Sequence, residues 1–135
     1  MAQGCALGAL LTLIAAPAGL AEAIAGCQPL QEQRQALARE AMQAEIALAG
    51  RYRQQLCPEL HRRAELANAN SQVFAPINYA ALLECRQAAE RQLEQENPLL
   101  YRNRAGFTFY SAAGHAAARL ADQQLERLQR QGCRP

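Results

Sequence analysis

The sequence contains no lysine and no tryptophan, and valine occurs only once among its 135 residues. Aromatic side chains make up 5% of the chain, and β-branched residues are scarce throughout. Because sheets favour β-branched and aromatic residues, their shortage argues against a sheet-based fold. The residues that dominate after position 27 are Ala, Leu, Gln, Arg and Glu, all of them strong helix formers. The composition therefore predicts an all-α protein.

The chain also lacks a large excess of either charge, because it has 14 arginines and 12 acidic residues and a formal net charge of only +2. Proteins that bind nucleic acids carry a clustered basic excess, so no nucleic-acid partner is expected. No C-x-x-C motif occurs, which argues against a thioredoxin-type redox protein. The two histidines are isolated from one another and from paired cysteines, so we expect neither a metal nor another cofactor.

The first 21 residues carry no charged side chain. Within them an apolar run from Cys5 to Leu20 contains a helix breaker, and small residues then allow cleavage after Ala21, Ala23 or Ala25. This pattern is typical of a signal peptide, although the usual positive residue near the N-terminus is missing. It predicts a signal peptide over 1–25, a single mature domain over 26–135, and a periplasmic or secreted location.

Two alternatives to a cleaved signal remain open. A run of about 16 to 20 residues diluted by Gly, Thr and Pro is marginal for spanning a bilayer, and we expect no integral span after cleavage. The segment Ile24 to Cys27 resembles a lipobox, in which Cys27 would be acylated and anchor a lipoprotein. Glu22, however, separates the apolar run from that cysteine, where a lipobox normally adjoins it.

Four cysteines remain after position 25, and an even number in an exported chain predicts two disulfides. They are Cys27, Cys57, Cys85 and Cys133. A helix over 30–55 would be about 39 Å long. Because bridged α-carbons lie within about 7 Å of each other, Cys27 pairs with Cys57 only if that helix breaks at Gly50. Of the two remaining arrangements we prefer Cys57–Cys85 with Cys27–Cys133, which ties both ends of the mature chain together.

Apolar periodicity predicts helices over 30–55, 58–66, 79–96 and 111–131. Asn78 and Ser111 are expected to cap the third and fourth helices, and Gly132 to end the last one. The predicted fold is a small bundle of three to four helices cross-linked by two disulfides. The inward-facing residues are expected to be Leu30, Leu37, Ala41, Ala44, Leu48, Tyr52 and Leu56 in the first helix, Tyr79, Leu82, Cys85, Ala89 and Leu93 in the third, and Ala117, Ala121, Leu125 and Leu128 in the fourth.

Residues 99–110 depart from helical chemistry and hold most of the aromatic side chains. Phe107 to Tyr110 favours a strand and 103–106 a turn, so either a short hairpin or an ordered loop fits. Tyrosine and arginine are favoured interface residues, and loops often carry function. The candidate binding surface consists of Tyr101, Arg102, Arg104, Phe107 and Tyr110. The alternative is structural, with these aromatics filling the open end of an alanine-rich bundle.

Two further pairs share helical turns, His61 with Glu65 and Ser111 with His115. Neither forms a recognisable catalytic or metal-binding motif, so we interpret them as exposed helix residues and predict no catalytic site. No motif matches a particular family. The sequence therefore predicts an exported, non-enzymatic binding module whose partner is an envelope or extracellular protein or a second copy of itself. A lipoprotein anchored through Cys27, with a structural role in the envelope, is the alternative.

Overall fold

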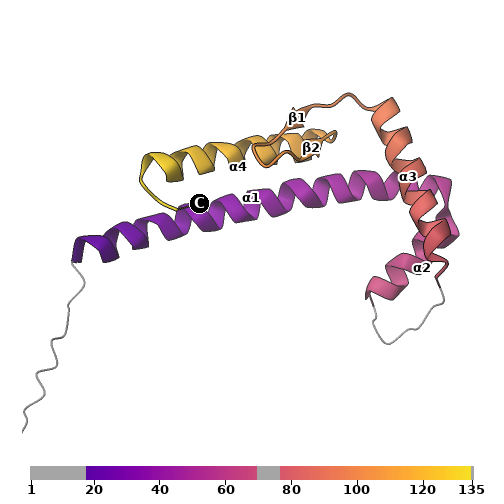
Figure 1. Cartoon of the computed structure of the whole chain (residues 1–135), viewed down its shortest axis with the longest axis horizontal. Coiled ribbons are helices and arrows are strands. Elements are labelled where there is room, and N and C mark those ends of the chain that lie inside the picture. Colours follow the sequence, from indigo (N-terminus) through magenta and orange to yellow (C-terminus); the bar gives the residue numbers. More distant parts are fainter. Residues whose placement is uncertain (1–17, 70–76, 135) are drawn as a thin grey trace, which may run out of the picture.

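The computed structural model describes residues 18–69 and 77–134, and the side chains from Gly26 onward (Figure 1). It contains four helices and a two-stranded hairpin, which confirms the predicted all-α fold with a short hairpin near 99–110. The elements are α1 (Ala18–Leu56), α2 (Pro58–Ala69), α3 (Tyr79–Glu96), β1 (Tyr101–Arg102), β2 (Thr108–Phe109) and α4 (Ala112–Arg130).

Helix α1 is the longest element, and the others are arranged along it. Helix α4 runs back beside α1, while α2 and α3 gather at the C-terminal end of α1 (Figure 1). The helix begins at Ala18 rather than near Leu30, so its predicted start was wrong. Residues before Pro29 are mostly Ala, Leu, Ile and Glu, whose helix propensity continues the helix on the N-terminal side of the proline. Residues 1–17 of the predicted leader lie outside the described residues.

The main hydrophobic cluster lies between α1 and α4. Ala41 of α1 packs with Ala117 and Ala118 of α4, and Phe109 from the hairpin fills the space beside them. Phe109 is 1% exposed, which makes it one of the two largest fully buried side chains. Small residues let two helices approach closely but supply little volume, so one large aromatic side chain completes this core.

The predicted stripes are largely confirmed, with two exceptions at helix ends. In α3 the residues Leu82, Cys85, Ala89 and Leu93 are buried, as predicted. Tyr79, the first residue of α3, is 76% exposed, and Leu56, the last residue of α1, is 46% exposed. Periodicity shows which way a side chain points, but burial also requires another element to extend over it. These two residues were therefore wrongly predicted as core.

Both disulfides join the predicted cysteines. Cys27 is bonded to Cys133 and Cys57 to Cys85, with α-carbons 5.7 and 6.2 Å apart. Helix α1 continues through Gly50, which leaves Cys27 and Cys57 at opposite ends of an unbroken segment. The nested arrangement confirms the preferred pairing.

The end of α4 brings Cys133 into position. Gly132 adopts a left-handed conformation with φ of 71°. Its N–H donates to the carbonyl of Gln129 at 3.1 Å, and the N–H of Cys133 donates to the carbonyl of Leu128 at 2.9 Å. These two bonds are those of a Schellman motif, which reverses the chain direction after a helix. The predicted role of Gly132 as a C-terminal cap residue is confirmed, and the turn directs Cys133 toward α1.

Candidate binding surface on the hairpin

The hairpin closes through a tight turn at its centre. Tyr101 is paired with Phe109 and Arg102 with Thr108. Asn103 holds the turn, because its side-chain oxygen accepts the N–H of Phe107 at 2.8 Å and its carbonyl accepts the N–H of Gly106 at 2.9 Å. Gly106 has φ of 89°, a conformation that side chains disfavour. Of the two expected conformations, the hairpin is therefore the one observed.

Tyr101 attaches the hairpin to α4. Its ring packs against the α1–α4 cluster and lies 5.7 Å from the ring of His115, centroid to centroid. Its hydroxyl donates a hydrogen bond to Oδ2 of Asp122 at 2.6 Å. That bond, together with burial, raises the pKa of Tyr101, because the phenolate would face a carboxylate in a partly desolvated place. The side chain of Tyr101 therefore has a structural role, because it attaches the hairpin to α4.

Arg104 adds a second attachment to the same face of α4. Its backbone N–H donates to Asp122 at 3.1 Å. Its guanidinium forms an ion pair with Glu126 and donates to Gln129 at 3.3 Å. We call Tyr101 and Arg104, with their acceptors Asp122 and Glu126, the hairpin latch. Two of the five residues of the predicted binding surface thus belong to the latch.

Tyr110 points to the other side of the hairpin, toward α1 and α3. Its hydroxyl lies 3.4 Å from Oε1 of Glu94, and its side chain lines a pocket between these helices. Its backbone N–H donates to Oε1 of Glu45 at 3.1 Å. Tyr110 is therefore half-buried at this pocket rather than part of an exposed surface.

Glu45 of α1 holds the junction between the hairpin and α4. Its Oε1 also accepts the N–H and the hydroxyl of Ser111, at 2.7 and 2.6 Å. Ser111 in turn accepts the N–H of Gly114 at 2.9 Å, which confirms its predicted capping role. A Cβ at Gly114 would lie 2.6 Å from both Glu45 and Ser111 and 3.2 Å from the carbonyl of Ala41. The start of α4 can approach α1 this closely only because residue 114 is glycine.

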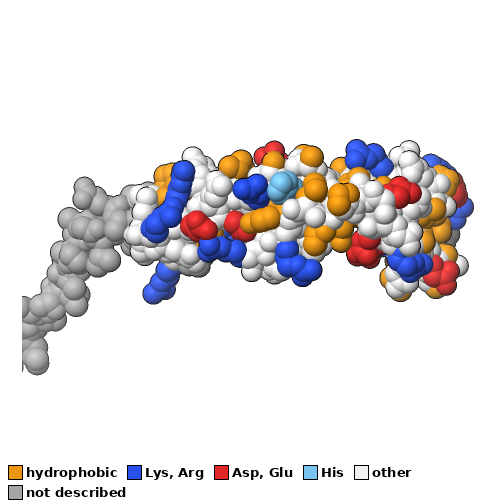
Figure 2. Space-filling model, turned by 90° about the horizontal axis from the view of Figure 1, so that it is seen from above, with side chains coloured by type: hydrophobic (Ala, Val, Ile, Leu, Met, Phe, Trp, Pro, Cys, Tyr) orange, Lys and Arg blue, Asp and Glu red, His pale blue; other side chains and the backbone are white. Residues whose placement is uncertain are grey.

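The residues left facing outward are mainly apolar. Phe107 is 55% exposed, and the adjoining connector contributes Leu99 and Leu100, at 48% and 40%. Arg102 is exposed beside them. We call Leu99, Leu100, Arg102 and Phe107 the hairpin face. Figure 2, which looks down on the molecule from the top of Figure 1, shows hydrophobic side chains gathered over the middle of this side, with arginines around them.

Sequence reasoning missed the two leucines of the hairpin face. The signal was present, because Leu99 and Leu100 follow Asn97-Pro98, which ends α3. Apolar residues directly after a helix end have no helical stripe to join. They either enter the core through a turn or remain at the surface, and the sequence does not distinguish these outcomes.

The other candidate pairs have ordinary structural roles. His61 is half-buried on α2 and Glu65 is exposed. His115 stacks beside Tyr101 and is half-buried rather than exposed, and the hydroxyl of Ser111 donates to Glu45. Within residues 18–69 and 77–134, no three His, Cys, Asp or Glu side chains gather in a way that could hold a metal ion.

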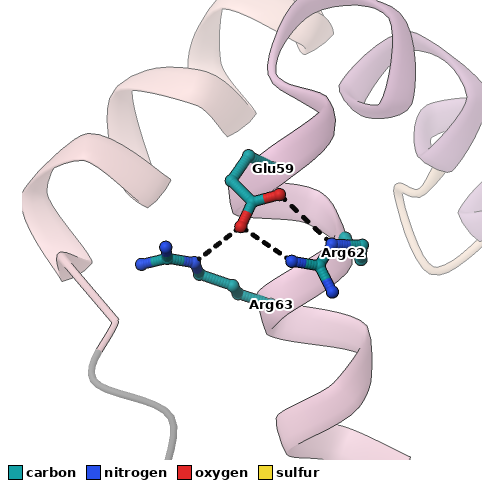
Figure 3. A network of polar contacts seen from close by, with 3 residues as sticks. All are labelled: Glu59, Arg62 and Arg63. Atoms are coloured by element: carbon teal, nitrogen blue, oxygen red, sulfur yellow. Dashed lines mark hydrogen bonds and ion pairs between the residues drawn. The ribbon is translucent and has the colours of Figure 1, made fainter.

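The adjacent arginines of α2 share one carboxylate of their own helix (Figure 3). Oε1 of Glu59 lies 2.8 Å from Nη2 of Arg62 and 3.0 Å from Nε of Arg63. Hydrogen bonds from the two guanidinium groups lower the pKa of Glu59. Since all three side chains are solvent-exposed, this network is an ordinary surface feature of α2, with one net positive charge.

No family model, no curated protein and no solved structure matches this chain. In the part of the chain that the structure describes, no helix is both long and apolar enough to cross a membrane. Two disulfides are compatible with an extracellular or periplasmic location, where such bonds persist.

Proposed function

We propose that this protein is an exported, non-enzymatic binding module that recognises another protein through the hairpin face. The observation that carries the proposal is the exposure of Phe107 on a tightly attached hairpin and of Leu99 and Leu100 on the connector that leads into it. Apolar side chains that gather at a protein surface mark interaction sites more often than apolar side chains that are scattered.

The attachment of the hairpin supports this role. The latch fixes the hairpin to α4, and Phe109, paired with Tyr101, inserts between α1 and α4. A surface held in one conformation before binding loses less conformational entropy when it docks. Tyr101 and Arg104 thus contribute by positioning the hairpin face, while Phe107 and Arg102 are the residues free to contact a partner.

Export is supported by the leader pattern and by the use of all four cysteines after position 25 in disulfides. Cytosolic conditions keep thiols reduced, so two structural disulfides favour an oxidising compartment. The bond from Cys27 to Cys133 also argues against the lipoprotein alternative, because an acylated sulfur has no valence left for a disulfide. Intact mass of the protein from its natural host distinguishes a free N-terminus from an acylated Cys27.

The test compares two equally exposed apolar residues, Phe107 at 55% and Leu83 of α3 at 56%. Oxidised wild-type, Phe107→Ser and Leu83→Ser proteins are immobilised and exposed to an envelope extract and to a second, soluble copy of the chain. We expect wild-type and Leu83→Ser protein to retain the same partner and Phe107→Ser to lose it. Because both side chains are exposed, both variants should melt near the wild-type temperature.

Two results would contradict the proposal. Equal retention by Phe107→Ser and Leu83→Ser would show that the hairpin face is not the contact surface. Retention of nothing by the wild-type protein, with the disulfides verified as intact, would remove the binding role altogether.

A further inference from the structure

A pocket of about 340 Å³ lies where α1, α3 and the end of the hairpin meet. Its apolar lining comes from Ala49 of α1 and from Ala89 and Leu93 of α3. The two α3 residues are 2% and 5% exposed, so they form a firm wall. This volume is near the lower end of the roughly 300–1,000 Å³ of small-molecule sites, which suits a short ligand with small side chains.

The charged side chains of the pocket are sorted by sign along its length. Arg53 lies one helical turn before Cys57, and Arg86 directly follows Cys85, so the disulfide brings the two arginine-bearing segments together. Glu45 lies two turns before Arg53 on α1. At 1.5 Å per residue, this separation along the helix is about 12 Å.

The same sorting recurs on α3. Glu90 and Glu94 follow Arg86 by one and two turns, toward the hairpin, where the hydroxyl of Tyr110 meets Glu94. The pocket is therefore positive at the disulfide end and negative at the hairpin end.

Glu45 accepts hydrogen bonds from Tyr110 and Ser111, and Glu94 accepts one from Tyr110, so part of the negative charge is engaged by the fold. None of the charged groups of the pocket, however, is in an ion pair among the described residues. The ion pairs among the described residues join Glu59 to Arg62 and Arg63, and Arg104 to Glu126. Two arginines that line the same end of a pocket from different helices favour an anion there. The planar guanidinium group matches a carboxylate especially well, since it can donate two parallel hydrogen bonds.

We propose that this pocket binds a short peptide with free termini in an extended conformation. The peptide carboxylate lies at Arg53 and Arg86, and its ammonium group lies at the hairpin end near Glu94, two turns from Arg86. An extended chain spans about 3.3–3.6 Å per residue, so charges about 12 Å apart correspond to roughly three or four residues. A single amino acid is too short to reach both ends. This site is separate from the hairpin face and does not depend on it.

The experiment is an NMR titration of the oxidised full chain with trialanine, compared with trialanine whose C-terminus is amidated or whose N-terminus is acetylated. The amide signals of Ala49, Ala89 and Leu93 should shift with the free peptide. Losing a charge-assisted hydrogen bond should weaken binding about tenfold, so each blocked peptide should bind correspondingly less tightly.

The variant that assigns the carboxylate end is Arg86→Gln, since Arg53 also borders a smaller cavity between α1 and α2. We expect Arg86→Gln to bind free trialanine about tenfold less tightly and to lose most of its discrimination against the amidated peptide. The matched control is Arg91→Gln, an exposed arginine of the same helix outside the pocket lining, which should behave as wild type.

Three results would overturn the proposal. The first is the absence of shifts at the pocket amides with free trialanine. The second is an equal response of Arg86→Gln and Arg91→Gln. The third is inorganic phosphate producing the same shifts and competing with the peptide at equal concentration, which would make the site a simple anion site. None of these depends on whether the hairpin face binds a protein.

Discussion

Helices α1 and α4 form a long antiparallel pair with the hairpin laid beside it, whereas α2 and α3 lie at the C-terminal end of α1 (Figure 1). The long pair buries Ala41, Phe109 and Leu128 at 1% exposure or less. In α2 only Ala64 is buried, and the link of this helix to α3 is reinforced by the disulfide Cys57–Cys85. The long pair also has a disulfide, Cys27–Cys133, but it packs along many more residues than α2 does. Each region therefore combines packing with one covalent bond, and α2 has the least packing beside its bond.

The difference shows two ways in which an alanine-rich chain can stabilise a small fold. Long helices with small residues at their contact gain many close van der Waals contacts along their length. Helix α2, with 12 residues and one buried side chain, offers too little area for this, so a constraint on the unfolded state is worth proportionally more to it. The predictions below test whether the two regions depend on these terms separately.

The largest effects are expected from removing the disulfides. Cys27–Cys133 spans 106 residues and Cys57–Cys85 spans 28. Loop-closure entropy then predicts losses in the free energy of unfolding of about 5 and about 3.5 kcal/mol for the paired serine substitutions. Chemical denaturation measures both values. Hydrogen exchange of Cys57→Ser/Cys85→Ser should show α2 and α3 opening while α4 stays protected.

Simultaneous loss of protection in α4 and α2 would contradict the distinction between the two regions, because it would show that the molecule unfolds as one unit. Rapid exchange confined to α2 and α3 would show that this region opens independently of the α1–α4 pair.

An intermediate effect is expected at Gly114, where α4 touches α1. In Gly114→Ala the new Cβ meets Glu45, Ser111 and the backbone of Ala41. Such overpacking should lower the free energy of unfolding by about 2 kcal/mol, even after the gain in helix propensity. Gly50→Ala is the matched control, because its Cβ would make only ordinary contacts at 3.8 and 4.0 Å.

Gly50→Ala should raise stability by up to about 1 kcal/mol, as expected for an unobstructed helix interior. Thermal unfolding compares the two variants directly. Equal stabilisation by both would mean that the close approach of α1 and α4 does not require glycine.

The smallest effect is expected at the latch. Tyr101→Phe removes the hydrogen bond to Asp122 and should cost about 1 kcal/mol. Because the pKa of Tyr101 is raised in the folded state, this contribution is present below about pH 10 and is lost as pH rises through the folded value. Ultraviolet titration of tyrosine should show Tyr101 ionising at lower pH in Asp122→Asn. An unchanged titration would contradict a latch at this position.

Much of the architecture was predictable because it depends on local rules. Ser111 and Asn78 cap helices as their side chains suggest, and the length of one helix excluded one of the three disulfide arrangements. The start of α1 was not predictable in the same way, since Pro29 reads as a helix boundary but is accommodated within the helix. Tyr79 and Leu56 show the same limit at helix ends, where periodicity no longer indicates burial.

The candidate site was predictable as a segment but not as a surface. Residues 99–110 were identified by composition, yet the structure assigns Tyr101 and Arg104 to the latch, Tyr110 to the pocket, and Leu99 and Leu100 to the exposed face. Each of these assignments depends on contacts with α1, α3 or α4 that are distant in the sequence.

The sequence alone determined the helix content and the caps, because these depend on residues within a few turns of one another. It also excluded the pairing of Cys27 with Cys57, because the helix between them is too long; the tertiary structure decided between the two remaining pairings. The tertiary structure alone decided that Glu45 would join the hairpin to α4 and that Arg53 and Arg86 would share a pocket. These contacts depend on the angles at which the helices pack. Those angles result from the packing of many side chains together, which no local sequence pattern encodes.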